Sequence, residues 1–320
     1  MNNYITLKYG CNPHQGSASV QSTKWGNLPF VELNGHSGYI NLLDALNAWQ
    51  LVKELDSTLG SPAATSFKHV SPAGAAIGET ITDAYRKARK ADPKSSFGDF
   101  IALSRKVDLE CAKYIKTVVS DGVVAPEYDE DALELLKQKK GGKYLILAMD
   151  AEYQPPSIET REIYGVVFSQ QRNDIKLSKE TLLTKIVTKN KELPEKAQDD
   201  LILASITLKY TQSNSIGFAL DGQMIGVGAG QQSRIDCTKL AGNKALIWAK
   251  DRWQGKQNLS KVSLASDAFF PFRDNIDYAA SCGVKHIIQT GGSVKDEEII
   301  KVADEYEMVM IFSGIRLFHH

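Results

Sequence analysis

Apolar residues along this chain alternate between the spacing of a helix and short continuous runs. Residues 41–55 carry apolar side chains three or four positions apart, which predicts an amphipathic helix with Asn41 as its N-cap. Residues 63–67 form a short apolar run that predicts a buried strand, and this strand would end at Lys68 and His69. The first part of the chain thus predicts a helix, then a strand whose end carries two titratable side chains.

The same alternation continues along the rest of the chain. Asp221-Gly222 predicts a hairpin turn. The apolar spacing of helices and strands is weaker between residues 154 and 193, where a boundary between two parts is expected. Helix–strand alternation is typical of an α/β fold, which we expect in two parts, residues 1–190 and 191–320. The spacing predicts further helices near residues 83–90, 109–119, 129–139 and 195–209 and from residues 274 and 294, and strands near residues 100–104, 123–125, 144–148, 216–219, 224–227, 262–265, 284–289 and 308–312.

Charge and cysteine content narrow the class of protein. Lys plus Arg and Asp plus Glu both number 38, so no overall positive charge attracts nucleic acid or membrane phosphates. No apolar run approaches the roughly 18 residues of a membrane span, and the N-terminus lacks the regions of a secretory signal. We expect a soluble cytoplasmic protein with a small-molecule substrate. Its four cysteines lack disulfide or zinc-site spacing; they are Cys11, Cys111, Cys237 and Cys282.

Lys68 and His69 are the first residues with candidate chemistry, at the start of the segment 68–74, Lys-His-Val-Ser-Pro-Ala-Gly. An ammonium beside an imidazole at a strand end favours a neutral histidine that acts as a base near pH 7. Charged pairs are also typical of solvated strand ends. The pair alone does not separate these two interpretations.

Residues 226–234, Gly-Val-Gly-Ala-Gly-Gln-Gln-Ser-Arg, lead into a predicted helix. Alternate glycines let backbone N–H groups approach an anion, the helix N-terminus adds partial positive charge, and Arg234 supplies a bidentate donor. The spacing differs from the dinucleotide fingerprint G-x-G-x-x-G. A plain tight turn is the competing interpretation.

Two further segments have alternative interpretations. Residues 266–274 gather three phenylalanines, which could form a shelf for a flat heterocycle or fill the core beside a helix cap at Asp274. The C-terminal residues 314–320 could be a frayed end carrying tag histidines, but Arg316 before an aromatic residue is not explained by a tag. The sequence has no nucleophile elbow, no zinc-deaminase or zinc-protease motif and no Walker A segment, so it lacks the residues of those chemistries.

Taken together, these segments resemble, nearly from end to end, the AICAR transformylase domain of the bifunctional purine biosynthesis enzymes. The resemblance implies a fold of two cytidine-deaminase-like α/β units and a homodimer whose two active sites draw on both subunits. It also admits a structural potassium ion, and no other metal is expected. The matching segments are residues 8–10, 12–15, 44–49, 68–74, 95–100, 210–214, 230–234, 266–272 and 316–320.

The resemblance also implies a reaction, in which a formyl group passes from 10-formyltetrahydrofolate to the 5-amino group of AICAR, giving FAICAR and tetrahydrofolate. The lone pair of the AICAR amine is delocalised, so the amine is a weak nucleophile and needs a base as it attacks. His69 would be this base and accept the proton of the amine. Lys68 would stabilise the oxyanion or protonate the departing folate nitrogen, and Asn214 would orient the nucleotide. The implied AICAR contacts are Lys8, Tyr9, His69, Gly98, Asp121, Asn214, Arg234, Phe269 and Arg316, and the implied folate contacts are Ile235, Asp274, Ser293 and Val294.

The sequence departs from the family pattern in several places. Lys8 replaces the usual Arg, so a bidentate phosphate contact becomes a point charge. Lys94 stands where the animal form has a methionine near the folate, and the segment between Trp253 and Val262 is much shorter than in the animal form. The N-terminal cyclohydrolase domain is missing, so we expect FAICAR ring closure to occur elsewhere.

Two other functions remain open at this point. One is a catalytically silent sensor that binds AICAR or folate, although Lys68, His69 and Asn214 argue against it. The other is an enzyme that uses formyl phosphate, or formate with ATP. The absence of a phosphate-activation motif argues against that alternative.

Overall fold

Helices and strands alternate along most of the chain in the computed structural model, which describes residues 3–23, 26–252, 259 and 261–320. The first series of elements is β3 (Phe30–Asn34), α1 (Tyr39–Leu59), β4 (Ala63–Lys68), β5 (Ser71–Ile77), α2 (Ile81–Lys90), β6 (Asp99–Leu103), α3 (Leu109–Thr117), β7 (Ser120–Ala125), α4 (Glu130–Lys137) and β8 (Leu145–Met149). The second series is α6 (Glu195–Lys209), β11 (Ile216–Leu220), β12 (Gln223–Gly228), α7 (Arg234–Arg252), β13 (Val262–Ser266), α8 (Asp274–Ser281), β14 (Val284–Gln289), α9 (Asp296–Glu305) and β15 (Val309–Phe312). The smaller elements are β1 (Tyr4–Leu7), η1 (Pro13–Gln15), β2 (Ala18–Gln21), η2 (Lys139–Gly142), β9 (Ile158–Ile163), β10 (Val166–Gln171) and α5 (Lys179–Leu182).

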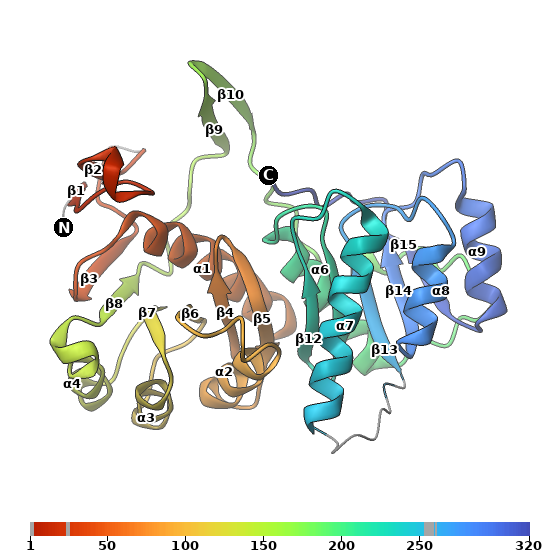
Figure 1. Cartoon of the computed structure of the whole chain (residues 1–320), viewed down its shortest axis with the longest axis horizontal. Helices are drawn as coiled ribbons and strands as arrows, with labels where there is room; N and C mark the ends of the chain where they lie inside the picture. The colour runs from red at the N-terminus through yellow and green to blue at the C-terminus, as the bar shows by residue number, and fades with distance from the viewer. Residues whose placement is uncertain (1–2, 24–25, 253–258, 260) are drawn as a thin grey trace.

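One mixed sheet extends across the molecule, and helices cover both of its faces (Figure 1). In the described residues it has eleven strands, in the order β15-β14-β13-β11-β12-β5-β4-β6-β7-β8-β3. Helices α1 and α6 share a single apolar core on one face. On the other face, α2, α3 and α4 cover the first half of the sheet and α7, α8 and α9 cover the second half. These three layers confirm the predicted α/β class.

The two series repeat the same succession of elements: helix, β-hairpin, then helix and strand three times over. Thus α1-β4-β5-α2-β6-α3-β7-α4-β8 corresponds to α6-β11-β12-α7-β13-α8-β14-α9-β15. The repeats meet where β5 and β12 pair antiparallel, through Ala76 and Gln223. They therefore lie side by side in opposite directions (Figure 1). Their likeness to cytidine deaminase and the division at residues 190 and 191 stay predictions.

The opposite direction of the repeats decides which ends of strands meet. β4 ends, and β6 and β7 begin, at the edge of the sheet where residues 69 and 70 turn. Because β12 is antiparallel to β5, β11 begins at this same edge and β13, β14 and β15 end there. We call it the site edge, and the other end of the strands the opposite edge.

Helix α1 begins earlier than the sequence suggested. The prediction of Asn41 as N-cap is wrong, because Gly38 occupies the N-cap position with an extended backbone and Tyr39 and Ile40 are already helical. Those two residues are exposed, so the apolar spacing used to locate the helix did not detect its first turn. A similar shift affects α9, which begins at Asp296 and not at Val294.

Several strands were not foreseen. β5 contains Pro72 and Gly74, residues with low strand propensity, and its pairing with β4 outweighs that propensity. β9 and β10 form a separate two-stranded hairpin that projects from the layered body (Figure 1). The hairpin lies in the segment where the sequence pattern was weak, and its residues are largely exposed. Among helices formed by the described residues, none combines the length and the apolar character that a membrane crossing requires.

Candidate active site

The residues with candidate chemistry in the two repeats meet at the site edge. Lys68 and His69 close the β4–β5 hairpin there, and Asn214 precedes β11. The backbone N–H of Gln212 donates to the Ser71 hydroxyl at 3.3 Å, which joins the turn after β4 to the loop before β11. The structure thus brings together two segments 145 positions apart in the sequence, the turn at His69 and the loop at Asn214.

The turn at His69 has an unusual backbone. Lys68 pairs with Ser71, so the turn has two central residues, His69 and Val70, with φ of 54° and 56°. Hairpin turns of this kind favour glycine or asparagine at both positions, and a β-branched residue there is an outlier. Backbone strain of this type is concentrated at functional sites, which makes the turn a candidate for function.

A buried carboxylate holds this turn. Asp44 of α1 is 5% exposed and accepts a hydrogen bond from the Val70 N–H at 2.7 Å. Burial raises the pKa of the Asp44 carboxyl, while the hydrogen bond from Val70 and the nearby His69 oppose that rise. Asp44 therefore fixes the backbone that carries the imidazole. The sequence signal for this role is an acid among the apolar positions of a helix.

Lys68 is held on the other side of the turn. Its ammonium donates to the Phe97 carbonyl at 2.7 Å, beside Gly98. Gly98 has φ of 73°, and a Cβ built there would lie 3.9 Å from the Lys68 Nζ. The positive φ favours glycine, whereas a Cβ at this distance would make only ordinary van der Waals contact with the ammonium. Gly98 therefore lies in contact range of the Lys68 ammonium and is required by the backbone conformation at this position.

Asp121 lies near the same group of residues, at the start of β7. Its carboxylate accepts a hydrogen bond from the Lys140 ammonium at 2.7 Å, and its charge contributes to the raised pKa of Asp44. The adjacent Lys139 has its pKa lowered to about 8, first by burial and then by the charge of Lys140. The first repeat therefore contributes several titratable side chains to the site edge.

Asn214 is fixed by a network in the second repeat. Its side-chain oxygen accepts a hydrogen bond from Nη2 of Arg234 at 2.7 Å, and its amide nitrogen donates to the carbonyls of Gln231 and Gln232 at 2.8 and 3.0 Å. Nη1 of Arg234 forms an ion pair with Asp267, which is fully buried. The amide of Asn214 thus has a defined orientation in the network.

Asp267 connects three segments, although sequence analysis gave it no role. One oxygen pairs with Arg234 and the other accepts from the Ser215 N–H at 2.8 Å. Its carbonyl accepts from the Leu317 N–H at 2.8 Å. An acid directly after a parallel strand is a signal that could have identified it. The glycine-rich segment before Arg234 is therefore more than an isolated tight turn, because its helix supplies a residue to this network.

The C-terminal segment packs on this network. The His319 N–H donates to the Ser213 hydroxyl at 3.0 Å, and the Ser213 N–H donates to the His319 carbonyl at 2.9 Å. Arg316 is exposed, and its guanidinium carbon lies 4.8 Å from the centre of the Phe318 ring. The C-terminal segment is therefore not a frayed end.

The remaining candidate residues follow strand ends. The aromatic run after β13 is divided between core and surface: Phe270 is fully buried, while Phe269 and Phe272 are 41% and 61% exposed. Ser293 and Val294 follow β14, Asp274 begins α8, and Ile235 is the second residue of α7. These folate candidates are brought to the site edge by the topology.

Lys8 and Tyr9 follow β1 and are exposed. Within the described residues, no hydrogen bond or ion pair joins them to the other candidates. Lys94 is exposed as well, and the shortened segment after Trp253 lies largely outside the described residues. Within the described ranges, no group of three or more His, Cys, Asp or Glu side chains could hold a metal ion, and the potassium ion stays a prediction.

Known proteins share sequence similarity with nearly the whole of this chain. Residues 1–244 match the family model described as "AICARFT/IMPCHase bienzyme". The chain is 38% identical over 320 residues to a "Bifunctional purine biosynthesis protein PurH" of Persephonella marina, covering 98% of this chain and 59% of that protein. A protein of the same name from Clostridium botulinum is 40% identical over 323 residues, again with 59% of its length covered.

The chain spans about three fifths of the length of these relatives. A solved structure titled "Structural genomics, protein ybgI, unknown function" is 10% identical and covers 86% of this chain and 87% of its own, but its TM-score of 0.16 does not indicate a shared fold. The family match covers more than half of the chain and includes most of the residues at the site edge. This chain therefore belongs to the AICARFT/IMPCHase bienzyme family.

Proposed function

We propose that these residues transfer a formyl group from 10-formyltetrahydrofolate to the 5-amino group of AICAR. Family membership supports a formyltransferase domain of purine biosynthesis. The observation that carries the proposal is the junction of the His69 turn with the Asn214 loop, through the hydrogen bond between Gln212 and Ser71. A base and a substrate-orienting amide from two repeats then act on one molecule.

The proposed reaction has a defined course for each proton. The AICAR amine attacks the formyl carbon, and His69 accepts the proton that the amine loses. Lys68 stabilises the charge that develops on the formyl oxygen, and the folate nitrogen takes a proton, from Lys68 or from protonated His69, as its bond to carbon breaks. The defined orientation of Asn214, held by Arg234, supports its role in aligning the nucleotide.

Substrate binding is proposed from the family resemblance and from exposure. Lys8 and Arg316 are exposed cations suited to the AICAR phosphate, and the exposed ring of Phe269 is suited to its heterocycle. Tyr9, Gly98, Asp121 and Arg234 complete the proposed nucleotide contacts. Ile235, Asp274, Ser293 and Val294 would lie along the folate.

We further propose that the chain acts as a homodimer with shared active sites. The β9–β10 hairpin supports this, since it has no strand neighbour within the described residues and exposes a set of large apolar side chains. The exposed apolar residues are Ile158, Ile163, Tyr164, Val166, Val167 and Phe168.

The length of the chain and its free thiols bear on the activity of these residues and on their location in the cell. The chain spans 59% of the bifunctional relatives, and we propose that these 320 residues carry formyl transfer and not ring closure. We also propose a cytoplasmic location, which the free thiols of Cys11, Cys111, Cys237 and Cys282 support.

An assay with purified protein, AICAR and 10-formyltetrahydrofolate tests the function. We expect FAICAR and tetrahydrofolate in equal amounts. A parallel reaction with formate and ATP in place of the folate should give no product. If the folate donor gives no product above background while AICAR still binds, the protein is a sensor and formyl transfer is wrong.

A further inference from the structure

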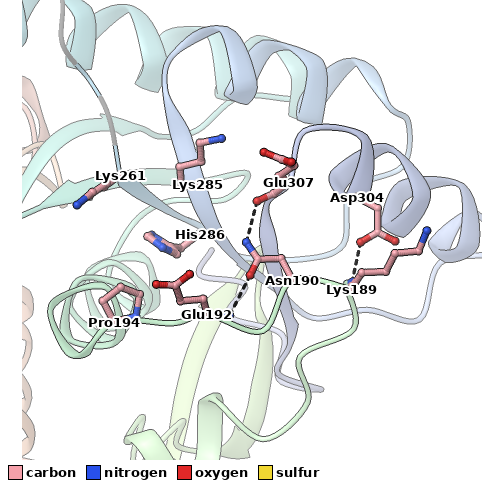
Figure 2. Close-up of a pocket in the computed structure, with 9 residues that line it drawn as sticks. All are labelled: Lys189, Asn190, Glu192, Pro194, Lys261, Lys285, His286, Asp304 and Glu307. Atoms are coloured by element: carbon pink, nitrogen blue, oxygen red, sulfur yellow. Dashed lines mark hydrogen bonds between the residues drawn. The ribbon is translucent and has the colours of Figure 1, made fainter.

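A cavity of about 680 Å³ lies at the opposite edge of the second repeat (Figure 2). In its wall, the backbone N–H of Lys189 donates to the Asp304 carboxylate at 2.7 Å, and the Asn190 amide donates to the Glu307 carbonyl at 3.0 Å. These hydrogen bonds hold the segment before α6 against α9 and the turn that follows it. They therefore serve the fold of the second repeat, at the other end of the strands from Lys68.

A buried ion pair lies close to the end of β4 in the first repeat. Asp99, the first residue of β6, is fully buried and accepts a hydrogen bond from Nη1 of Arg89 at 2.7 Å. Its other carboxylate oxygen accepts a hydrogen bond from the Ser66 hydroxyl at 2.6 Å. Burial raises the pKa of the Asp99 carboxyl, and the charge of Arg89 and the hydrogen bond from Ser66 oppose that rise. The two partners thus compensate for the loss of water around this carboxylate.

Ser66 connects this ion pair to the strand that carries Lys68. Side chains two positions apart in a strand point to the same face, so Ser66 and Lys68 share one face of β4. The Ser66 hydroxyl also lies 2.7 Å from the hydroxyl of Ser96, which is buried as well. Ser96 immediately precedes Phe97, whose carbonyl accepts the hydrogen bond from the Lys68 ammonium. Through Ser66, Asp99 therefore holds both segments that this hydrogen bond joins.

The loop of residues 95–98 has a further contact with the same ion pair. The Gly98 N–H donates to the Val119 carbonyl at 3.1 Å. Nη2 of Arg89 donates to this same carbonyl, also at 3.1 Å. The ion pair and the loop thus form one hydrogen-bonded unit, which fixes the loop relative to β4.

The second repeat contains a corresponding ion pair. Arg89 belongs to α2 and Asp99 to β6, while Arg234 belongs to α7 and Asp267 directly follows β13, which are the equivalent elements. The second pair fixes Asn214 through a hydrogen bond from Arg234. A buried ion pair is a weak source of stability compared with apolar packing. Its presence in both repeats, each time beside a residue assigned to formyl transfer, points to a role in positioning.

We propose that Asp99 is a positioning residue of formyl transfer, a role that rests on the proposed function. Together with Arg89 and Ser66, it keeps the Phe97 carbonyl where this carbonyl directs the Lys68 ammonium toward the formyl oxygen. Asp99 is fully buried, so it acts through Lys68 and not by contact with a substrate.

Ser66→Ala tests this role without leaving a buried charge unpaired, because Asp99 keeps Arg89 as its partner. We expect turnover in the formyl-transfer assay to fall roughly tenfold, since the ammonium loses its fixed position. The KM for 10-formyltetrahydrofolate should change by less than about twofold. An unchanged turnover would overturn the role of Asp99.

The matched control is Ser104→Ala. Ser104 follows β6 at the opposite edge, and its hydroxyl donates at 2.6 Å to Asp56, which forms an ion pair with Arg105. The control therefore removes the same kind of hydrogen bond far from Lys68. We expect its midpoint of urea unfolding to fall while its turnover stays unchanged. Equal losses of turnover in the two serine variants would mean that Asp99 affects only stability.

A cycle of variants with Lys68→Met separates positioning from other effects. The rate of Lys68→Met is measured in single turnovers with excess enzyme. Ser66→Ala should slow the unmodified protein but not the Lys68→Met protein, because its effect passes through the ammonium. Equal slowing in both backgrounds would contradict this role and leave formyl transfer standing. If the unmodified protein forms no FAICAR, the proposed function is wrong, and this role with it.

Discussion

At the scale of single residues, the backbone at His69 has a strained conformation that contacts from other parts of the chain hold in place. His69 and Val70 both adopt positive φ in a turn where glycine would be unstrained. The sequence identified Lys68 and His69 by their chemical types and strand-end location, and that location is confirmed. It could not reveal the strained turn, because positive φ at non-glycine residues follows from tertiary contacts such as that with Asp44.

Replacing His69 by alanine tests its role as base. We expect turnover to fall by roughly 10² or more, because a positioned general base contributes at about this level. Steady-state formyl transfer measures the effect, and His36→Ala is the matched control, since His36 is exposed and belongs to no proposed contact. An unchanged rate in His69→Ala would remove the residue from the reaction.

Arg316 is expected to act through binding. We expect Arg316→Ala to raise the Michaelis constant for AICAR roughly tenfold with little change in turnover, since loss of a uniform contact affects KM alone. Arg316→Lys keeps the charge and should recover part of the affinity. A large fall in turnover at unchanged KM would contradict the assignment.

At the scale of elements, the two repeats use the same device to hold a hairpin. Asp44 is the sixth residue of α1 and Asp200 the sixth of α6. Each carboxylate accepts from the second N–H of the turn that follows, Val70 in one case and Gly222 in the other, both at 2.7 Å. The second turn has the favoured Asp-Gly sequence, whereas the first carries residues of the candidate site.

This correspondence supplies a matched pair of variants. Asp44→Ala and Asp200→Ala should each lower the free energy of unfolding by about 1–3 kcal/mol, because a buried N–H loses its acceptor. Only Asp44→Ala should also lower turnover, by roughly tenfold, and Asp44→Asn should recover much of it, since it retains an acceptor. Equal losses of turnover in both alanine variants would mean that Asp44 affects only stability.

Asp200 also predicts a dependence of stability on pH. Burial raises its pKa to about 7 from 3.8, so between these values the folded state holds a proton that the unfolded state has lost. The contribution to stability is fully present below pH 3.8 and is lost as pH rises through 7. From pH 5 to pH 8, Asp200→Asn should gain about 2–3 kcal/mol relative to the unmodified protein in denaturant unfolding. If the free energies of unfolding of both proteins change in parallel with pH, the raised pKa of Asp200 is wrong.

Helices and strands with strong apolar patterns were predictable, and others were not. β14 lies where the spacing placed it, and Asp221-Gly222 forms the expected turn. β5 was not predicted, because its Pro, Ala and Gly residues have no strand pattern and its extended conformation depends on pairing with β4. β9 and β10 were not predicted, because an exposed hairpin has no buried face and therefore needs no alternation of apolar and polar residues.

At the scale of the whole molecule, the projecting hairpin predicts the state of assembly. Phe168→Asp places a charge on its exposed apolar surface and should shift the protein from dimer to monomer, with lower turnover if the active sites are shared. Analytical ultracentrifugation at several concentrations measures the shift. Ser169→Asp, the next position along β10 and on its other face, is the control. A protein that is monomeric without substitution would contradict the proposed homodimer.

The reversed direction of the repeats has an electrical consequence for the site edge. Helices α7, α8 and α9 follow strands that end there, so their N-termini and partial positive charges gather over the half with Arg234 and Phe269. Helices α2, α3 and α4 reach the same edge with their C-termini, which carry partial negative charge. The edge is thus polarised along its length by the backbone alone. An approaching anion would be turned toward the second repeat before any side chain touches it.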